Sequence, residues 1–292
     1  MSNLLTTKQM ALFVARGFLR FDAVVPDEIN QTVLAAIQAG GPQDGILIEG
    51  SEVHSYPPGT RLSNCYVDQP AIRQLLDLPE VQGIIKSLVG EDPLFDHHAI
   101  HHCPPNQNTA QYTHADSIID TRTNFDIQLM YYPHEVTAGM GGTRYIPGSH
   151  FRRVNEMTIA RYQNIKGQQH VVCPAGTLLV MHHGIWHGGG RNQSDQPRYM
   201  FKIRLNATEK QVKLWDTSDL EEKSIGPKAI FDPDAYSHRD RVQTIFEIPE
   251  TWFPMDESRL ETVNRIKLWR YLVGDESFDS HHWLTRIENI NH

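Results

Sequence analysis

The sequence predicts a mostly β protein, with a jelly-roll core flanked by helices and followed by a C-terminal extension. Short strand-type segments separated by Pro, Gly and Asn fill residues 91–206, and such spacing is typical of an antiparallel barrel or a double-sheet jelly roll. Helical periodicity dominates the residues before that region. A polar, loop-rich stretch with one further helix follows it. We therefore expect a domain over residues 1–206 and an extension over residues 207–292.

The composition indicates an ordinary globular protein. Of the 292 residues, 39% are hydrophobic and 21% are charged, values that match typical globular domains. The formal net charge of -8 disfavours a protein that coats nucleic acid or an anionic membrane surface. We therefore expect a small-molecule partner, and neither nucleic acid nor membrane.

Cysteine usage and the N-terminus indicate a reducing compartment. The three cysteines are odd in number and form no CxxC pair, so a disulfide framework or a cysteine zinc site is not expected. The first residues lack the basic region, apolar run and cleavage site of a signal peptide. No apolar stretch approaches the ~20 residues of a membrane span. These features predict a cytoplasmic protein.

The first helix begins with a capping box. Thr6 stands three residues before Gln9, and the apolar residues that follow recur at helical spacing. Gly17 is the expected stop. The segment 18–25, FLRFDAVV, reads as a short strand.

Two further helical regions precede the core. Pro26 is expected to open a helix that ends at the glycines 40–41. A third helical region spans residues 69–90. The helical N-terminal part thus reaches to about residue 90.

The jelly-roll strands are short and separated by breakers. The expected segments are LFDHHAIHH (94–102), AQYTHAD (110–116), FDIQLMYYP (125–133), TRYIP (143–147), HVVCP (170–174), TLLVMHH (177–183) and RYMFKIRL (198–205).

The C-terminal extension contains one amphipathic helix. Residues 256–273 carry apolar side chains at roughly helical spacing, and Gly274 is the expected stop. We expect the extension to pack on the core or to form a homodimer interface.

A metal site is the main functional hypothesis. His114 and Asp116 lie two residues apart, and on a strand such residues point to one face. This pair alone is weak evidence, since the chain has 16 histidines. His187, in a glycine-rich turn after the strand 177–183, can complete a set of two histidines and one carboxylate. That set leaves open coordination positions and suits non-haem Fe(II).

The residues around His187 support a carboxylate-binding site. Arg198 follows eleven residues later, at the start of the next strand, and a guanidinium can hold a carboxylate with two hydrogen bonds. Lys202 and Arg204 on that strand are alternative carboxylate binders, but the spacing favours Arg198. The block GGTRYIPGSH adds Thr143, whose hydroxyl can bond a carboxylate.

Together these motifs resemble the phytanoyl-CoA dioxygenase family of Fe(II)/2-oxoglutarate-dependent oxygenases, over roughly residues 10–205. The resemblance implies a double-stranded β-helix of the jelly-roll, cupin-like type. It implies Fe(II) held by His114, Asp116 and His187, and Arg198 as the partner of the distal carboxylate of 2-oxoglutarate.

The resemblance also implies supporting cosubstrate contacts. Thr143 matches one of them, and either Gln111 or Tyr112 matches another, with no choice between them from the sequence. Many relatives carry a small polar residue where this chain has Gly189. The hydrogen bond from that position must be absent here or supplied elsewhere.

The reaction implied is the hydroxylation or desaturation of a small organic metabolite, with 2-oxoglutarate and O₂ converted to succinate and CO₂. Asp116 argues against a halogenase, since related halogenases have glycine or alanine there. The loop 117–125 is an expected substrate contact. Two alternatives stay open: a zinc-dependent hydrolase that uses the same three ligands, and a non-catalytic jelly-roll binding protein.

Overall fold

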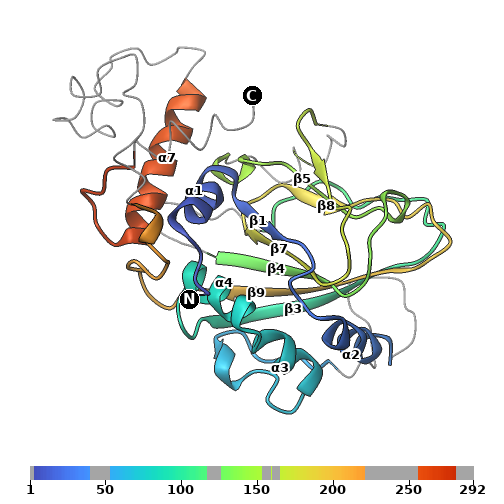
Figure 1. The fold of residues 1–292 in the computed structure, drawn as a ribbon. Helices are drawn as coiled ribbons and strands as arrows, with labels where there is room; N and C mark the ends of the chain where they lie inside the picture. The colour runs from blue at the N-terminus through green and yellow to red at the C-terminus, as the bar shows by residue number, and fades with distance from the viewer. Residues whose placement is uncertain are drawn as a thin grey trace.

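The core consists of two antiparallel sheets (Figure 1). The computed structural model describes residues 3–39, 53–116, 126–152, 159, 165–220 and 256–280. The larger sheet has the strand order β1-β7-β4-β9-β3-β2, and the smaller has the order β6-β5-β8. The larger sheet contains β1 (Phe18–Phe21), β2 (Thr60–Arg61), β3 (Leu94–Cys103), β4 (Asp126–Tyr132), β7 (Thr177–His182) and β9 (Arg198–Asn206). The smaller sheet contains β5 (Thr143–Tyr145), β6 (Gln169–His170) and β8 (His187–Gly189).

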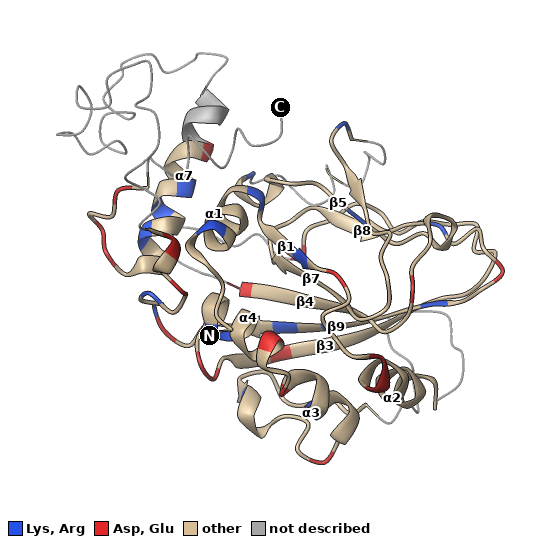
Figure 2. Ribbon diagram, in the orientation of Figure 1, with Lys and Arg blue, Asp and Glu red and all other residues tan. Residues whose placement is uncertain are grey.

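Helices cover one face of the larger sheet. The described α-helices are α1 (Thr7–Arg16), α2 (Asp27–Gln38), α3 (Pro70–Leu76), α4 (Pro79–Val89) and α7 (Asp256–Val273). In Figure 1, α2 and α3 lie below β3 in the view, and α7 lies beside α1. Charged residues are concentrated on the helices and loops, with few along the strands (Figure 2). No described helix is long and apolar enough to cross a membrane.

Alternation along the strands of the larger sheet separates two environments. On β4, Ile127, Leu129 and Tyr131 point into the core shared with the helices. Met130 and Tyr132 point the other way, into a smaller apolar cluster between the two sheets. Polar side chains can therefore gather on the face of the larger sheet that points away from the helices.

Helix α1 begins and ends as predicted. The Thr6 hydroxyl accepts from the Gln9 amide, and the Gln9 side chain accepts from the Thr6 amide. Gly17 ends the helix with φ +78°. A Cβ at Gly17 would also lie 2.5 Å from the His150 ring, so this position requires glycine for its backbone angle and for its space.

The predicted helical region 69–90 forms two helices. The first, α3, ends at Leu76, and α4 starts at Pro79. Proline has no amide hydrogen to continue a helix but suits the first turn of a new one. The break therefore follows from Pro79.

Two local predictions around the metal site differ from the structure. Residues 110–116 form no regular strand, only an isolated bridge at His114. His187, predicted in a turn, begins the short strand β8, which pairs with β5. Gly188 allows the backbone to pair here, because a Cβ at this position would lie 2.8 Å from the carbonyl oxygen of Tyr112. Glycine in a strand permits this close approach of two backbones.

In the described part of the C-terminal extension, helix α7 packs against helix α1. Trp269 of α7 is buried, with its ring centroid 6.0 Å from that of Trp215. On the same helix, Glu261 pairs with Arg152 at 2.8 Å. The helix ends before Gly274, whose φ is +74°. The remaining extension residues, 221–255 and 281–292, and the loop 117–125 lie outside the described residues.

Candidate metal centre

His114 and His187 face one another through their backbones. The amide of His114 donates to the carbonyl of His187 at 2.9 Å, and the reverse bond measures 2.8 Å. This reciprocal pair is the hydrogen-bonded unit of an antiparallel ladder. It brings the two imidazole centroids to 4.6 Å.

Backbone carbonyls orient both rings. The Nδ1 of His114 lies 2.8 Å from the carbonyl oxygen of Tyr112, and the Nδ1 of His187 lies 3.0 Å from that of Ile185. Since a carbonyl only accepts, each Nδ1 carries the hydrogen. In the neutral form of each ring, Nε2 then keeps its lone pair for a metal ion.

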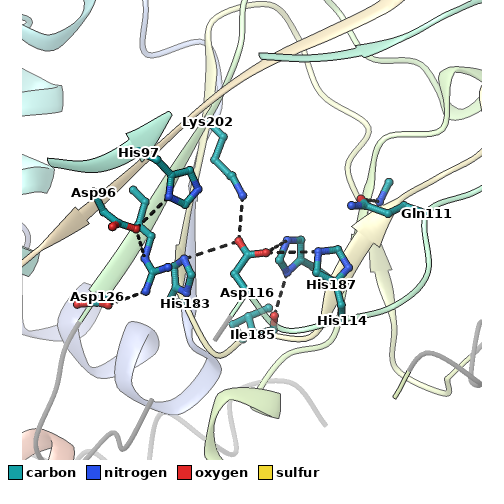
Figure 3. Close-up of polar contacts among 12 residues, drawn as sticks. Asp96, His97, Gln111, His114, Asp116, Asp126, His183, Ile185, His187 and Lys202 are labelled. Atoms are coloured by element: carbon teal, nitrogen blue, oxygen red, sulfur yellow. Dashed lines mark hydrogen bonds and ion pairs between the residues drawn. The ribbon is translucent and has the colours of Figure 1, made fainter. Parts of the chain in front are cut away.

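Asp116 supplies the third ligand atom, beside the two rings (Figure 3). Its Oδ1 lies 3.3 Å from the Nε2 of His114 and 3.8 Å from the Nε2 of His187. One ligand atom from each of the three residues lies within 4.8 Å of the other two. The predicted triad therefore converges, although residues 110–116 are not a regular strand.

The environment keeps the carboxylate of Asp116 ionised. Burial favours the neutral acid, but the hydrogen bond with His114, the positive charge of Lys202 and the neighbouring ring of His187 outweigh burial. Together they hold the pKa of Asp116 well below its usual range. An anionic ligand is what a divalent cation requires.

The two histidines differ in their protonation. Burial lowers the pKa of His187 to about 4, despite the opposing charge of Asp116. Burial also favours a lower pKa for His114, but the hydrogen bonds of His114 with Asp116 and with the Tyr112 carbonyl outweigh burial and raise its pKa above the ordinary value. His187 is thus the neutral donor at neutral pH, and a proton on His114 would have to leave before a metal binds.

The three ligands open onto a cavity of about 310 Å³ between the sheets. Strands β3, β4, β5, β8 and β9 contribute to its wall. The lining includes His101, Cys103, Gln111, Met130, Thr143, Gly189, Arg198, Met200 and Lys202 besides the three ligands. Two imidazole nitrogens and one carboxylate oxygen beside such an opening fit Fe(II), because the site keeps positions open for further ligands.

Arg198 and Thr143 lie in the same cavity as the triad. Arg198 is buried opposite Cys103 on β3, and its Nε donates to the carbonyl of Met140 at 3.3 Å. The Thr143 hydroxyl accepts from the hydroxyl of Tyr132 at 2.8 Å, which leaves its own hydrogen for a ligand. Both residues can therefore present donors to an anion in the cavity.

Gln111 and Tyr112 are placed differently. Gln111 lines the cavity, and its Oε1 accepts from the amide of Gly189 at 2.9 Å. The side chain of Tyr112 is 70% exposed and is not part of the cavity wall. Gln111 therefore fills the space beside Gly189 with a polar group.

The two alternative cations on β9 have other partners. Lys202 lines the cavity and bonds Asp116 at 3.0 Å. Arg204 pairs with Asp96 at 3.2 Å and with Asp126 at 3.0 Å. The alternation of β9 places both on the face of Arg198, but the sequence does not reveal which carboxylate each one meets.

The fold is shared with several solved enzymes. Apo HygX from Streptomyces hygroscopicus superposes with a TM-score of 0.52 at 14% identity, covering 74% of this chain and 94% of that chain. EctD from S. alaskensis, solved with 2-oxoglutarate and 5-hydroxyectoine, gives 0.52 at 18% identity, covering 69% and 76%. SnoK, a non-haem α-ketoglutarate-dependent carbocyclase from nogalamycin biosynthesis, gives 0.52 at 17% identity, covering 76% and 92%. These similarities confirm the jelly-roll prediction.

Sequence comparison identifies the family. No curated protein matches the chain. The family model for phytanoyl-CoA dioxygenase (PhyH) matches residues 14–200, which is more than half of the sequence. This match leaves no support for the zinc-hydrolase or non-catalytic alternatives. The chain belongs to the phytanoyl-CoA dioxygenase family, and it is an Fe(II)/2-oxoglutarate-dependent dioxygenase.

Proposed function

We propose that this dioxygenase hydroxylates, or desaturates, a small organic metabolite at the cavity between the two sheets. In this proposal His114, Asp116 and His187 hold Fe(II), and Arg198 binds the distal carboxylate of 2-oxoglutarate. Thr143 and Gln111 support the same cosubstrate, and Tyr112 is the less favoured candidate. The bound ion supplies the activation of O₂ as 2-oxoglutarate is converted to succinate and CO₂.

One observation carries the proposal: the three metal-ligand atoms and the buried guanidinium line one cavity. A guanidinium suits a carboxylate because it offers two parallel donors. Met130 and Met200 add apolar side chains to the wall of the same cavity. Apolar wall excludes water and so strengthens the interactions that hold the reactants.

The experiment measures binding of Fe(II) and 2-oxoglutarate without O₂, followed by succinate formation in air. We expect His187→Ala to lose metal binding. Arg198→Lys keeps the charge but loses the planar pair of donors, so 2-oxoglutarate affinity should fall about tenfold while Fe(II) affinity stays.

The matched control is Arg204→Lys, which makes the same change six residues further along β9, at a side chain paired with Asp96 and Asp126. It should leave 2-oxoglutarate affinity within about twofold of wild type. Intact metal binding in His187→Ala, or equal effects of the two arginine variants, would sink the proposal.

Two wider expectations are also proposed. A cytoplasmic location agrees with the cysteines, since Cys65, Cys103 and Cys173 are all buried free thiols. A homodimer through the C-terminal extension is tested by light scattering, and a monomer at micromolar concentration would contradict it.

A further inference from the structure

Lys202 is a buried cation beside the metal ligands. Its side chain is 9% exposed, and its Nζ donates to the Oδ2 of Asp116 at 3.0 Å. Pairing fixes its position on both sides, with Ala99 opposite on β3 and Met130 opposite on β4. The ammonium is thus directed at Asp116 from a central strand and not from a loop.

The two oxygens of Asp116 have different neighbours (Figure 3). Oδ1 faces the Nε2 atoms of His114 and His187, at 3.3 and 3.8 Å. Oδ2 faces Lys202 at 3.0 Å and the Nε2 of His183 at 3.7 Å. The carboxylate is therefore held with one oxygen toward the ligand cluster and the other away from it.

We propose that Lys202 is a positioning residue, which holds Oδ2 of Asp116 away from the metal so that Asp116 offers Oδ1 alone. A carboxylate can grip an ion with one oxygen or with two. With two, it takes one of the three positions that the triad would leave open on a six-coordinate ion, so that a cosubstrate chelating through two atoms would fill both remaining positions and leave none for O₂. This inference rests on the proposed ligand set, and it adds a residue that keeps that set open.

The position of Lys202 distinguishes it from Arg198. Lys202 lies four positions after Arg198 on β9, which corresponds to about 13 Å of extended strand. Among the described residues no carboxylate pairs with the guanidinium of Arg198, which lines the cavity, whereas Lys202 is paired with Asp116. The two cations therefore serve different carboxylates.

The test uses Co(II) alone as the probe, followed by 2-oxoglutarate, with Lys202→Met and Lys202→Arg. Met retains most of the length but neither donates nor carries charge. We expect Lys202→Met to bind Co(II) at least as tightly as wild type, because a positive charge beside the ion has been removed. Its Co(II) absorption spectrum should change before any 2-oxoglutarate is added, since Oδ2 becomes free to coordinate.

The same variant should bind 2-oxoglutarate about tenfold more weakly, because Oδ2 would take one of the three open positions and leave the cosubstrate a single way to chelate. Lys202→Arg keeps the positive charge and a donor, so it should show the wild-type Co(II) spectrum and the wild-type affinity for 2-oxoglutarate. Arg204→Met is the matched control: it removes a neighbouring cation that pairs with Asp96 and Asp126, so the Co(II) spectrum should match wild type. Should Lys202→Met fail to fold, Lys202→Gln replaces it with the same expected spectrum.

Three results would overturn the inference. A wild-type spectrum with weaker 2-oxoglutarate binding would mean that Lys202 contacts the cosubstrate directly. Parallel loss of Co(II) and 2-oxoglutarate affinity in a folded variant would mean a structural role. A wild-type Co(II) spectrum together with wild-type 2-oxoglutarate affinity in Lys202→Met would mean that Lys202 does not position Asp116. Failure of the wild-type chain to bind Co(II) would instead refute the proposed ligand set.

Discussion

Gln111 and Gly189 show how one residue can compensate for another. The glycine has no side chain to offer a cosubstrate, but its amide donates to Oε1 of Gln111 at 2.9 Å. With Oε1 engaged, the Gln111 amide group keeps its two N–H donors. The hydrogen bond that the sequence leaves unassigned at position 189 can therefore come from Gln111.

This arrangement predicts different effects for two adjacent substitutions. Gln111→Ala removes a cavity donor and leaves the Gly189 amide without its partner, so KM for 2-oxoglutarate should rise about five- to tenfold, corresponding to roughly 1 kcal/mol. Tyr112→Ala changes a side chain that is 70% exposed, and KM should stay within about twofold. Steady-state kinetics with varied 2-oxoglutarate decides between them. A larger effect at Tyr112 would reverse the assignment.

The residue-scale features that the sequence predicts are those set by spacing. The separation of His114 and Asp116 predicts that they share a site, and their ligand atoms converge with that of His187. The distance of Arg198 from His187 predicts that it lies nearby, and it lines the same cavity. The partner of Lys202 could not be predicted, because alternation gives the face of a strand but not which side chain on a distant segment meets it. Asp116 lies 86 residues from Lys202 in the chain.

At the scale of elements, the long helices and strands were the most predictable. The cap at Thr6 and the stop at Gly17 define α1 because both act within the helix itself. Strand β8 was wrongly assigned as a turn, because three successive glycines normally disfavour a strand. Its pairing depends on tertiary contact with β5 and with the Tyr112 backbone, which local propensity does not contain.

Helix α7 gives a prediction for stability. Trp269 is 1% exposed and contacts Trp215 and Phe278, with ring centroids at 6.0 and 5.7 Å. Trp269→Ala should lower the free energy of unfolding by about 3–5 kcal/mol through lost burial and a cavity. Urea unfolding measures this.

Glu276→Ala is the control, because it removes only an exposed pair with Lys210 and should cost less than about 1 kcal/mol. Co(II) affinity should survive in both variants, since neither residue lines the metal cavity. If Trp269→Ala were as stable as wild type, α7 would not contribute to the folded core.

At the scale of the whole molecule, several histidines are buried in the core and not at the metal. The Nδ1 of His98 lies 2.8 Å from the Tyr66 hydroxyl, and burial lowers the pKa of His98 to about 4. Burial also lowers the pKa of His182 to about 3. An unfolded histidine takes up a proton below pH ~6.5, whereas these folded ones resist it.

Stability should therefore fall on acidification between pH 6.5 and pH 4. Above this window His98 is neutral in both the folded and the unfolded protein, and below it His98 is protonated in both. Within the window only the unfolded protein binds the proton, so His98 lowers the free energy of unfolding by on the order of 3 kcal/mol across it. His98→Asn keeps an acceptor for Tyr66 but cannot titrate, and it should flatten the pH dependence. Urea unfolding at pH 7 and pH 4.5 measures the difference.

The exposed His170 provides the control for this experiment. His170→Asn should leave the slope of stability against pH closer to wild type than His98→Asn does. Equal slopes for wild type and His98→Asn would show that burial of His98 does not link folding to protons.

The jelly-roll class was predictable because many short strands each carry their own breakers. The strand order was not, since β1 near the N-terminus pairs with β7 far along the chain. The described helix of the C-terminal extension was predicted from its own period, but its contact with α1 depends on the shape of both surfaces.

The reciprocal backbone bonds between His114 and His187 have a consequence for how the apoprotein meets its ion. The two ligands stand 73 positions apart in the sequence, and closing such a loop in a free chain opposes binding by on the order of 4 kcal/mol in its length-dependent part. In the fold, backbone amides and carbonyls close that loop, and no ligand atom takes part in those bonds. The two imidazoles are therefore held side by side by the backbone, and the ion binds a preorganised chelate.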